Sequence, residues 1–248
     1  MRFEKEFFND FLNKCVDIYA SNHNTINLLN FKREKIITKM YVQAKKKYIT
    51  QIVANEKKIY KDPTTKVTGV EINKSDLCAF SRKKLKDLAD LMFEGDTPDK
   101  DKMTQFIRKT YKEFVQQPLE QISTPKGVGD YDKYSIPLSL PFQYKAHTPM
   151  ANKASIIYNY IIKERKLPLQ EVSNGTKIKY IYVLESNKYK TNVIGYVGNF
   201  PKEFSKIFIF DLDTQFEKQF LNIAQRMFDT LGFGTIQMKD SKINKLFD

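Results

Sequence analysis

The chain of 248 residues carries 42 lysine and arginine residues against 29 acidic ones, and its formal net charge of +13 favours a polyanionic partner. The apolar fraction is 41%, yet no run approaches the ~18 apolar residues of a membrane span and no apolar signal segment is visible. The sequence therefore argues against secreted and membrane-spanning classes, and the wide spread of its lysines disfavours a basic membrane-surface helix. Cys15 and Cys78 lie in apolar helical patterns and are interpreted as buried free thiols in a reducing cytoplasm.

The first predicted element is an amphipathic helix over residues 3–19, followed by a polar connection over residues 21–30. His23 in that connection is interpreted as a surface residue. Apolar side chains recur at helical spacing and predict a stripe packed against a core: Phe3, Phe7, Phe8, Phe11, Leu12, Cys15 and Tyr19.

Strands are predicted over residues 36–60, with turns near residues 55–58 and 62–65. A basic segment, Ala-Lys-Lys-Lys-Tyr at residues 44–48, opens a hairpin-like part of this region and continues into β-branched residues. The two-residue period of a strand places Lys46 and Tyr48 on the same face. Lysines fixed there can contact phosphates, and a solvated basic surface is the alternative interpretation.

Two helices are predicted after Gly69. The first is capped by Ser75 and Asp76 and ends at Gly95, and the second opens at Thr97-Pro98 and ends at Pro118. Their apolar stripes are Leu77, Phe80, Leu85, Leu88 and Met92 in the first helix, and Met103, Phe106, Ile107, Tyr111, Phe114 and Val115 in the second.

Residues 118–147 are rich in proline, glycine, tyrosine and lysine, and a loop with two glycines is expected over residues 123–134. This loop has neither the Gly-Lys-Ser/Thr ending of a P-loop nor the G-x-G-x-x-G spacing, so nucleotide binding by that route is rejected. Its glycine amides, together with Lys126 and Lys133, can contact a phosphate. An ordinary surface loop is the alternative.

The last part of the chain alternates helices with a strand pair. A helix opens at Thr148-Pro149 and directs Ile156, Ile157, Tyr160 and Ile161 inward, and residues 177–184 and 192–197 are expected to pair as strands. Asp213 is predicted to cap a final helix that ends at Gly232, which explains the Asp-Leu-Asp at residues 211–213 better than metal binding does. Two histidines and two cysteines far apart exclude a zinc site of standard spacing.

Several segments in order resemble one known family. Residues 31–36 and 44–48 are similar to the strand entry and the lysine-x-tyrosine motif of family B DNA polymerases, in the form seen in replicative polymerases of T-even-type phages. Residues 66–75 resemble the family's palm-to-thumb crossing, residues 123–134 its thumb loop, and residues 241–248 its clamp-binding peptide. Lys153 and Ala154 stand where the family usually carries arginine and glycine, which argues against a bidentate phosphate clamp there.

The resemblance implies an α+β fold made of the C-terminal part of the palm over residues 1–72 and a mostly helical thumb with a β-hairpin over residues 73–238. Residues 239–248 would form a flexible clamp-binding tail. The implied contacts to primer–template DNA come from Lys45, Lys46, Lys47, Tyr48, Lys74, Ser75, Lys126, Lys133 and Lys153. The implied contacts to a sliding clamp come from Ile243, Leu246 and Phe247.

The family's catalytic motifs, D-x-x-S-L-Y-P and Y-G-D-T-D, do not occur in this sequence, so no catalytic or metal-binding residue is expected in the chain. The resemblance implies that Mg²⁺ and its carboxylates belong to an N-terminal polymerase chain or segment with exonuclease and palm motifs. It also implies a viral protein in the cytoplasm of an infected bacterial host. A stand-alone basic nucleic-acid-binding accessory protein without polymerase activity, or a decayed remnant, are the alternatives.

Overall fold

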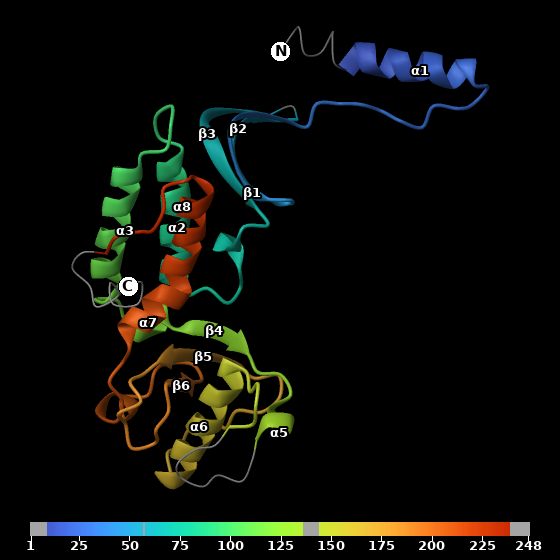
Figure 1. Ribbon diagram of the computed structural model, residues 1–248. Helices are drawn as coiled ribbons and strands as arrows, with labels where there is room; N and C mark the ends of the chain where they lie inside the picture. The colour runs from blue at the N-terminus through green and yellow to red at the C-terminus, as the bar shows by residue number, and fades with distance from the viewer. Residues whose placement is uncertain (1–8, 57, 136–143, 239–248) are drawn as a thin grey trace. The chain divides into compact units, whose positions relative to one another are not determined.

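The computed structural model describes residues 9–56, 58–135 and 144–238, and the chain divides into an N-terminal unit (residues 1–68) and a C-terminal unit (residues 69–248) (Figure 1). Each unit combines helical structure with one small antiparallel sheet, so the expected α+β class is confirmed. None of the helices in the described ranges has the length and apolar character needed to cross a membrane. The assignment of palm, thumb and tail to these residues stays a prediction.

The N-terminal unit holds a three-stranded antiparallel sheet in the order β1 (Lys35–Ala44), β2 (Lys47–Asn55) and β3 (Lys58–Thr68). The central strand β2 is rich in β-branched residues, and it buries Ile49 and Ile52 between its two neighbours. The strands expected over residues 36–60 are confirmed, whereas the turn expected over residues 62–65 is wrong because these residues belong to β3. Pro63 is tolerated there because β3 is an edge strand and its register shifts between Ile52 and Ala54 of β2.

The first helix, α1 (Leu12–Asn22), differs from the core-packing helix that the sequence predicts. Phe3, Phe7 and Phe8 lie outside the described residues. Phe11 is 52% exposed and Tyr19 is 64% exposed, Cys15 is an exposed rather than a buried thiol, and Ala20 is the one buried residue of the helix as described. The periodicity correctly predicts a helix, but the described members of its apolar stripe are exposed.

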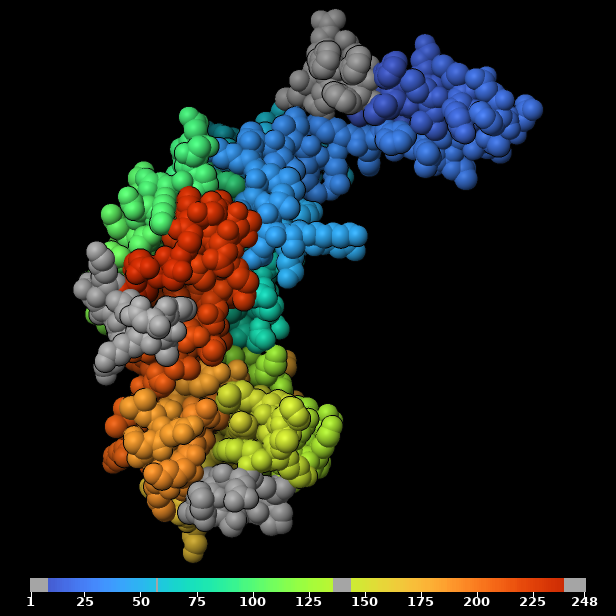
Figure 2. Space-filling model, viewed as in Figure 1, coloured from blue at the N-terminus to red at the C-terminus, as the bar shows by residue number. Residues whose placement is uncertain are grey.

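Five helical segments in the C-terminal unit build one aromatic core. They are α2 (Ala79–Met92), α3 (Lys100–Phe114), and a continuous C-terminal run of α7 (Leu212–Phe216), η4 (Glu217–Leu221) and α8 (Asn222–Thr230). Helix α2 packs against both α3 and η4 (Figure 1), and Figure 2 shows the red surface of the C-terminal run beside a green surface in this view. Phe216 joins the segments, because its ring contacts Tyr111 and Phe114 of α3 edge to face, each at 5.2 Å between centroids.

Helix caps depart from prediction at three places. Helix α2 begins after Cys78, since Asp76 is paired with Lys126 and does not cap it. Helix α3 is capped by Asp99, whose carboxylate accepts from the amides of residues 101 and 102, so Thr97 is not the cap. Asp211 rather than Asp213 caps α7, accepting from the amide and the hydroxyl of Thr214. In each case the observed cap lies two or three residues from the predicted one.

The second sheet has the order β4 (Thr124–Gly127), β5 (Lys177–Tyr182) and β6 (Val193–Tyr196), so the expected pairing of the last two strands is confirmed. Strand β4 lies inside the segment predicted as a loop, and α5 (Tyr131–Tyr134) follows it. Helix α6 (Met150–Glu164) packs on β6, where a Cβ on Gly195 would meet the carbonyl oxygen of Ala154 at 3.0 Å. Short segments complete the unit: η2 (Glu71–Asn73), α4 (Leu119–Ile122) and η3 (Phe204–Lys206).

Candidate nucleic-acid interface

The basic segment of the N-terminal unit forms the tip of the β1–β2 hairpin. Ala44 pairs with Lys47, so Lys45 and Lys46 make a two-residue connection, and Lys46 has a left-handed backbone with φ +63°. Lys46 is therefore not on the strand, and the expectation that it shares a face with Tyr48 is wrong. Lys45 and Lys46 form the tight turn, so the alternation of side chains between the two faces of the strand begins only at Lys47.

All three lysines of this tip are exposed. Among the residues that the structure describes, none of them forms an ion pair. Tyr48 is half-buried and pairs with Val42 of β1 and Thr68 of β3, which fixes its backbone in the sheet. The hairpin thus presents a compact group of cations that form no ion pair with described residues, next to a half-buried tyrosine.

Lys66 of β3 is a cation that sequence reasoning missed, because its segment was interpreted as a crossing between domains. It pairs with Thr50, so it lies on the same face of the sheet as Tyr48 under the strand period. Its side chain is exposed. The β-branched residues Val67 and Thr68, which directly follow Lys66, were the signal in the sequence that favoured a strand here.

Lys74 and Ser75 lie in the turn that leads into α2. Arg82 of α2 holds this turn, since its guanidinium donates to the carbonyl oxygens of residues 74, 75 and 77 at 3.0 to 3.4 Å. The ammonium of Lys74 is paired with Glu71 at 2.9 Å. Arg82 was not predicted as a positioning residue, because contacts of a side chain with preceding carbonyls leave no pattern in a sequence.

Lys126 of β4 is paired with Asp76 at 3.0 Å. Partial burial raises the pKa of Asp76, but the hydrogen bond and the charge of Lys126 outweigh it, so this pKa lies below its ordinary value. The pair brings two segments about 50 residues apart in the sequence into contact. Lys126 and Lys74 therefore already have anionic partners, unlike the lysines of the hairpin tip.

A pocket of about 320 Å³ lies beside Lys126 at the amino end of α6. Pro149 precedes this helix and no side chain caps it, so its first amides and the helix dipole favour an anion. Asn152 is buried and donates to the carbonyl oxygen of Gly129 at 2.8 Å, which ties the glycine segment to the helix. Asp130 also lines this pocket and opposes an anion there.

Lys133 and Lys153 do not line this pocket. Lys133 lies over the ring of Tyr134, which does line it, and Lys153 lies over the ring of Tyr144, each ammonium 5.3 Å from the ring centroid. The C-terminal unit thus brings Lys126 together with the amino end of α6. Lys133 and Lys153 are close in sequence to residues that line this pocket but do not line it themselves. Ile243, Leu246 and Phe247 lie outside the described residues.

The described residues hold no cluster of side chains suited to a metal ion. In residues 9–56, 58–135 and 144–238, no three histidine, cysteine or acidic side chains gather so that they could hold a metal ion. Asp211 is occupied as a helix cap, and the carboxylate of Asp213 accepts a hydrogen bond from the hydroxyl of Tyr111. The described side chains do not fit Mg²⁺, and its expected place outside this chain stays a prediction.

Comparison with known families decides the wider identity of the chain. A family model for DNA polymerase family B matches residues 11–231. The chain belongs to DNA polymerase family B. This membership gives the protein a role related to DNA polymerase and makes DNA and other polymerase components its natural partners. The matched residues include every described lysine assigned to DNA above. Comparison with curated proteins finds no matching sequence.

Proposed function

We propose that this chain is the C-terminal palm-and-thumb part of a family B replicative DNA polymerase of the T-even-type phage kind. In this proposal, residues 1–72 end the palm, residues 73–238 form the thumb that grips primer–template duplex, and residues 239–248 bind a sliding clamp. The observation that carries the proposal is the β1–β2 tip with its three exposed lysines, which lies inside the segment that matches the family.

Duplex binding by this chain would be electrostatic and independent of base sequence. Lysine ammonium groups contact phosphates without reading base edges, and a duplex carries one charge for about every 1.7 Å of its axis. Lys45, Lys46 and Lys47 would bind adjacent phosphates while Tyr48 packs near the primer end. In the proposed thumb, the residues that would contact the duplex product behind the active site are Lys74, Ser75, Lys126, Lys133 and Lys153.

Catalysis in this proposal belongs to a partner. Two carboxylates with two metal ions stabilise the attacking and leaving oxygens in nucleotidyl transfer. We propose that an N-terminal polymerase chain or segment with exonuclease and palm motifs supplies them, in the cytoplasm of an infected bacterial cell. This chain would contribute grip on the duplex and attachment to the clamp.

The salt dependence of duplex binding tests the hairpin tip. Each phosphate contact contributes about 0.9 to the slope of log affinity against log salt, so replacing Lys45, Lys46 and Lys47 by glutamine lowers the slope by about 2.7. The matched control is Lys163→Gln, an exposed lysine of α6 that is already paired with Glu171 at 2.8 Å. An unchanged slope in the triple variant rules the tip out as a duplex contact.

Two further assays separate the polymerase from a stand-alone accessory protein. Primer extension that appears only when this chain is mixed with a chain carrying the exonuclease and palm motifs supports the polymerase. Strong preference for one duplex sequence, without such complementation, favours the accessory protein.

Deleting residues 241–248 should abolish binding to the clamp while duplex affinity is unchanged, and clamp binding that survives the deletion removes that part of the proposal.

A further inference from the structure

Exposed apolar side chains gather around α1 and the segment that follows it. Nine large apolar side chains within residues 11–37 are exposed among the described residues, with Ile26 at 86% and Leu28 at 89%. Isolated exposed apolar residues are ordinary on a protein surface, whereas such a concentration marks an interaction site. These side chains are exposed because α1 contacts the rest of its unit through its polar face.

The polar face of α1 is occupied inside the unit. Asn13 exchanges two hydrogen bonds with the backbone of Phe31, at 2.6 and 2.7 Å, and the carboxylate of Asp17 accepts from Asn27 at 2.6 Å. One turn earlier, Asn9 accepts from the amide of Arg33 at 3.1 Å. Residues four apart share one face of a helix, so these three side chains fasten the extended segment along a single face.

The apolar side chains of α1 form a second face, beside and opposite the one that holds the segment. Leu12, Ile18 and Tyr19 lie on this apolar face by their helical spacing, and their exposed fractions are 38%, 52% and 64%. Apolar contact with another molecule would remove this area from water, which is the main favourable contribution to protein association.

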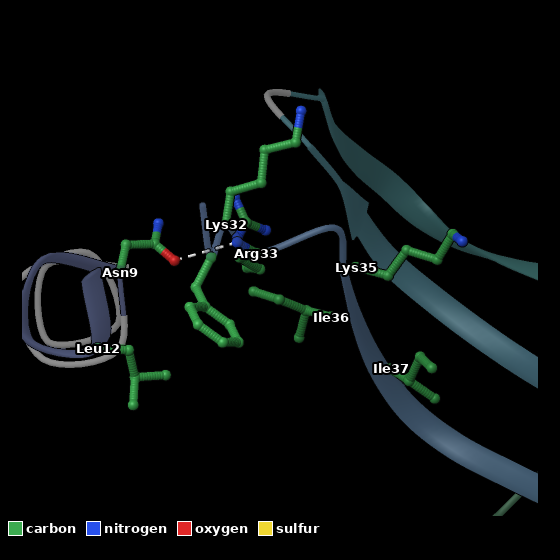
Figure 3. Close-up of a pocket in the computed structure, with 8 residues that line it drawn as sticks. Asn9, Leu12, Lys32, Arg33, Lys35, Ile36 and Ile37 are labelled. Atoms are coloured by element: carbon green, nitrogen blue, oxygen red, sulfur yellow. Dashed lines mark hydrogen bonds between the residues drawn. The ribbon is translucent and has the colours of Figure 1, made fainter. Parts of the chain in front are cut away.

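A pocket of about 560 Å³ continues this face between α1 and β1. Figure 3 shows Asn9 and Leu12 entering it from the helix and Ile36 and Ile37 from the strand, with the ammonium groups of Lys32 and Lys35 directed away from its middle. Phe31 and Arg33 complete the lining, and none of the lining residues is acidic. The site thus has an apolar floor and a cationic rim.

We propose that this face, formed by α1 and residues 31–37, binds an acidic amphipathic helix of a partner protein. Apolar side chains at helical spacing would fill the floor between Leu12 and Ile36, and carboxylates on the flanks of that helix would pair with Lys32 and Lys35. The ammonium of Lys35 forms an ion pair with the carboxylate of Glu34, so Lys32 contributes more of the attraction between the rim and an acidic partner.

The charge and the apolar character of the face favour an acidic helix over two other occupants, a second copy of this chain and duplex DNA. A second copy of this chain brings a net charge of +13 and the same cationic rim, so like charges would meet. Duplex DNA offers charge for the rim but no aliphatic side chains for the floor. The proposal does not depend on the DNA-binding function, since the hairpin tip and this face share no residue.

The probe is a fluorescein-labelled peptide of about 18 residues with leucines at i, i+3, i+4 and i+7, glutamates on the two flanks of this apolar stripe and alanines elsewhere, so that its length and composition favour a helix. Binding to the full chain is measured by anisotropy at physiological salt. Lys32→Glu and Ile18→Ser should each weaken binding roughly tenfold, by losing a charge pair and a buried side chain. The matched control Lys61→Glu, at an exposed lysine on β3, should change it less than about twofold.

A second peptide with every glutamate replaced by lysine should not bind. The proposal is overturned if the acidic peptide does not bind, if both peptides bind equally, or if Lys32→Glu and Ile18→Ser leave the affinity unchanged. Displacement of the peptide by duplex DNA would make the face a nucleic-acid site instead. A dimer in sedimentation experiments that Ile18→Ser dissociates would make it a contact between copies.

Discussion

The two units treat their large apolar side chains in opposite ways. Of the fourteen that are exposed among the described residues, twelve lie in the N-terminal unit, and only Leu184 and Ile209 lie in the C-terminal unit. The C-terminal unit instead buries linked aromatic rings, with Phe216 fully buried between Tyr111 and Phe220. Burial of apolar area is the main favourable contribution to folding, so the C-terminal unit contains the more complete core.

Truncating one side chain in each unit tests this comparison most severely. Phe216→Ala should destabilise the C-terminal unit by about 3–5 kcal/mol, because it removes a buried ring and leaves a cavity among three others. Ile18→Ala in α1 should change stability by no more than about 0.5 kcal/mol, since that side chain is already 52% exposed. Urea unfolding followed by circular dichroism measures both. Equal losses would show that α1 is as well packed as the aromatic core.

Adding a methyl group tests the density of the same core. Gly195→Ala places a Cβ about 3.0 Å from the carbonyl oxygen of Ala154, so α6 and β6 must separate, at about 1–3 kcal/mol. Gly127→Ala in β4 meets no atom within 4 Å and needs no left-handed backbone, and it should leave the unfolding free energy nearly unchanged. A tolerated alanine at residue 195 would show that the helix and the strand are loosely packed.

Alkaline pH should weaken the C-terminal unit through one buried and one half-buried tyrosine. Burial raises the pKa of Tyr180 and of Tyr196 to about 12, against about 10 in an unfolded chain. Their folded pKa values are raised, so their contribution to stability is complete below about pH 10 and is lost as the pH rises towards 12. Urea midpoints at about pH 9 and about pH 11.5 measure the loss, and Tyr196→Phe should reduce it. An equal loss in Tyr196→Phe would assign the effect to other groups.

Sequence patterns predicted those elements whose own residues favour them. Strand β2 has Ile49, Ile52 and Val53, and the helices α2, α3, α6 and α8 have apolar residues at helical spacing, so local preference and the fold agree. Strand β4 was missed because Pro125 and Gly127 disfavour strands, and it exists through pairing with β5, where Lys126 lies opposite Ile178. The exposure of α1 could not be predicted, since periodicity shows that a face is apolar but not what covers it.

The candidate site was predictable as a set of lysines but not as a set of interactions. Lys45, Lys46 and Lys47 are conspicuous as a run, and the structure places them on an exposed hairpin tip. The pairing of Lys126 with Asp76 depends on the meeting of β4 with the turn before α2, which no local pattern encodes. The choice of Asp211 over Asp213 as helix cap follows from the hydrogen bond between Asp213 and Tyr111, about a hundred residues apart.

The smallest effect that we predict concerns an ion pair on the surface of the C-terminal unit, where charge rather than packing determines the effect of a substitution. Asp76→Asn removes the partner of Lys126 in a pair whose side chains are 38% and 49% exposed, and such exposed pairs contribute at most about 1 kcal/mol to stability. The same change frees Lys126 for a phosphate and should raise duplex affinity about two- to fivefold, whereas Lys126→Gln should lower the salt slope by about 0.9. Glu171→Gln is the matched control, because it releases Lys163 on α6 and should leave duplex affinity unchanged. If Asp76→Asn weakens duplex binding, the ion pair positions Lys126 for the phosphate rather than competing with it.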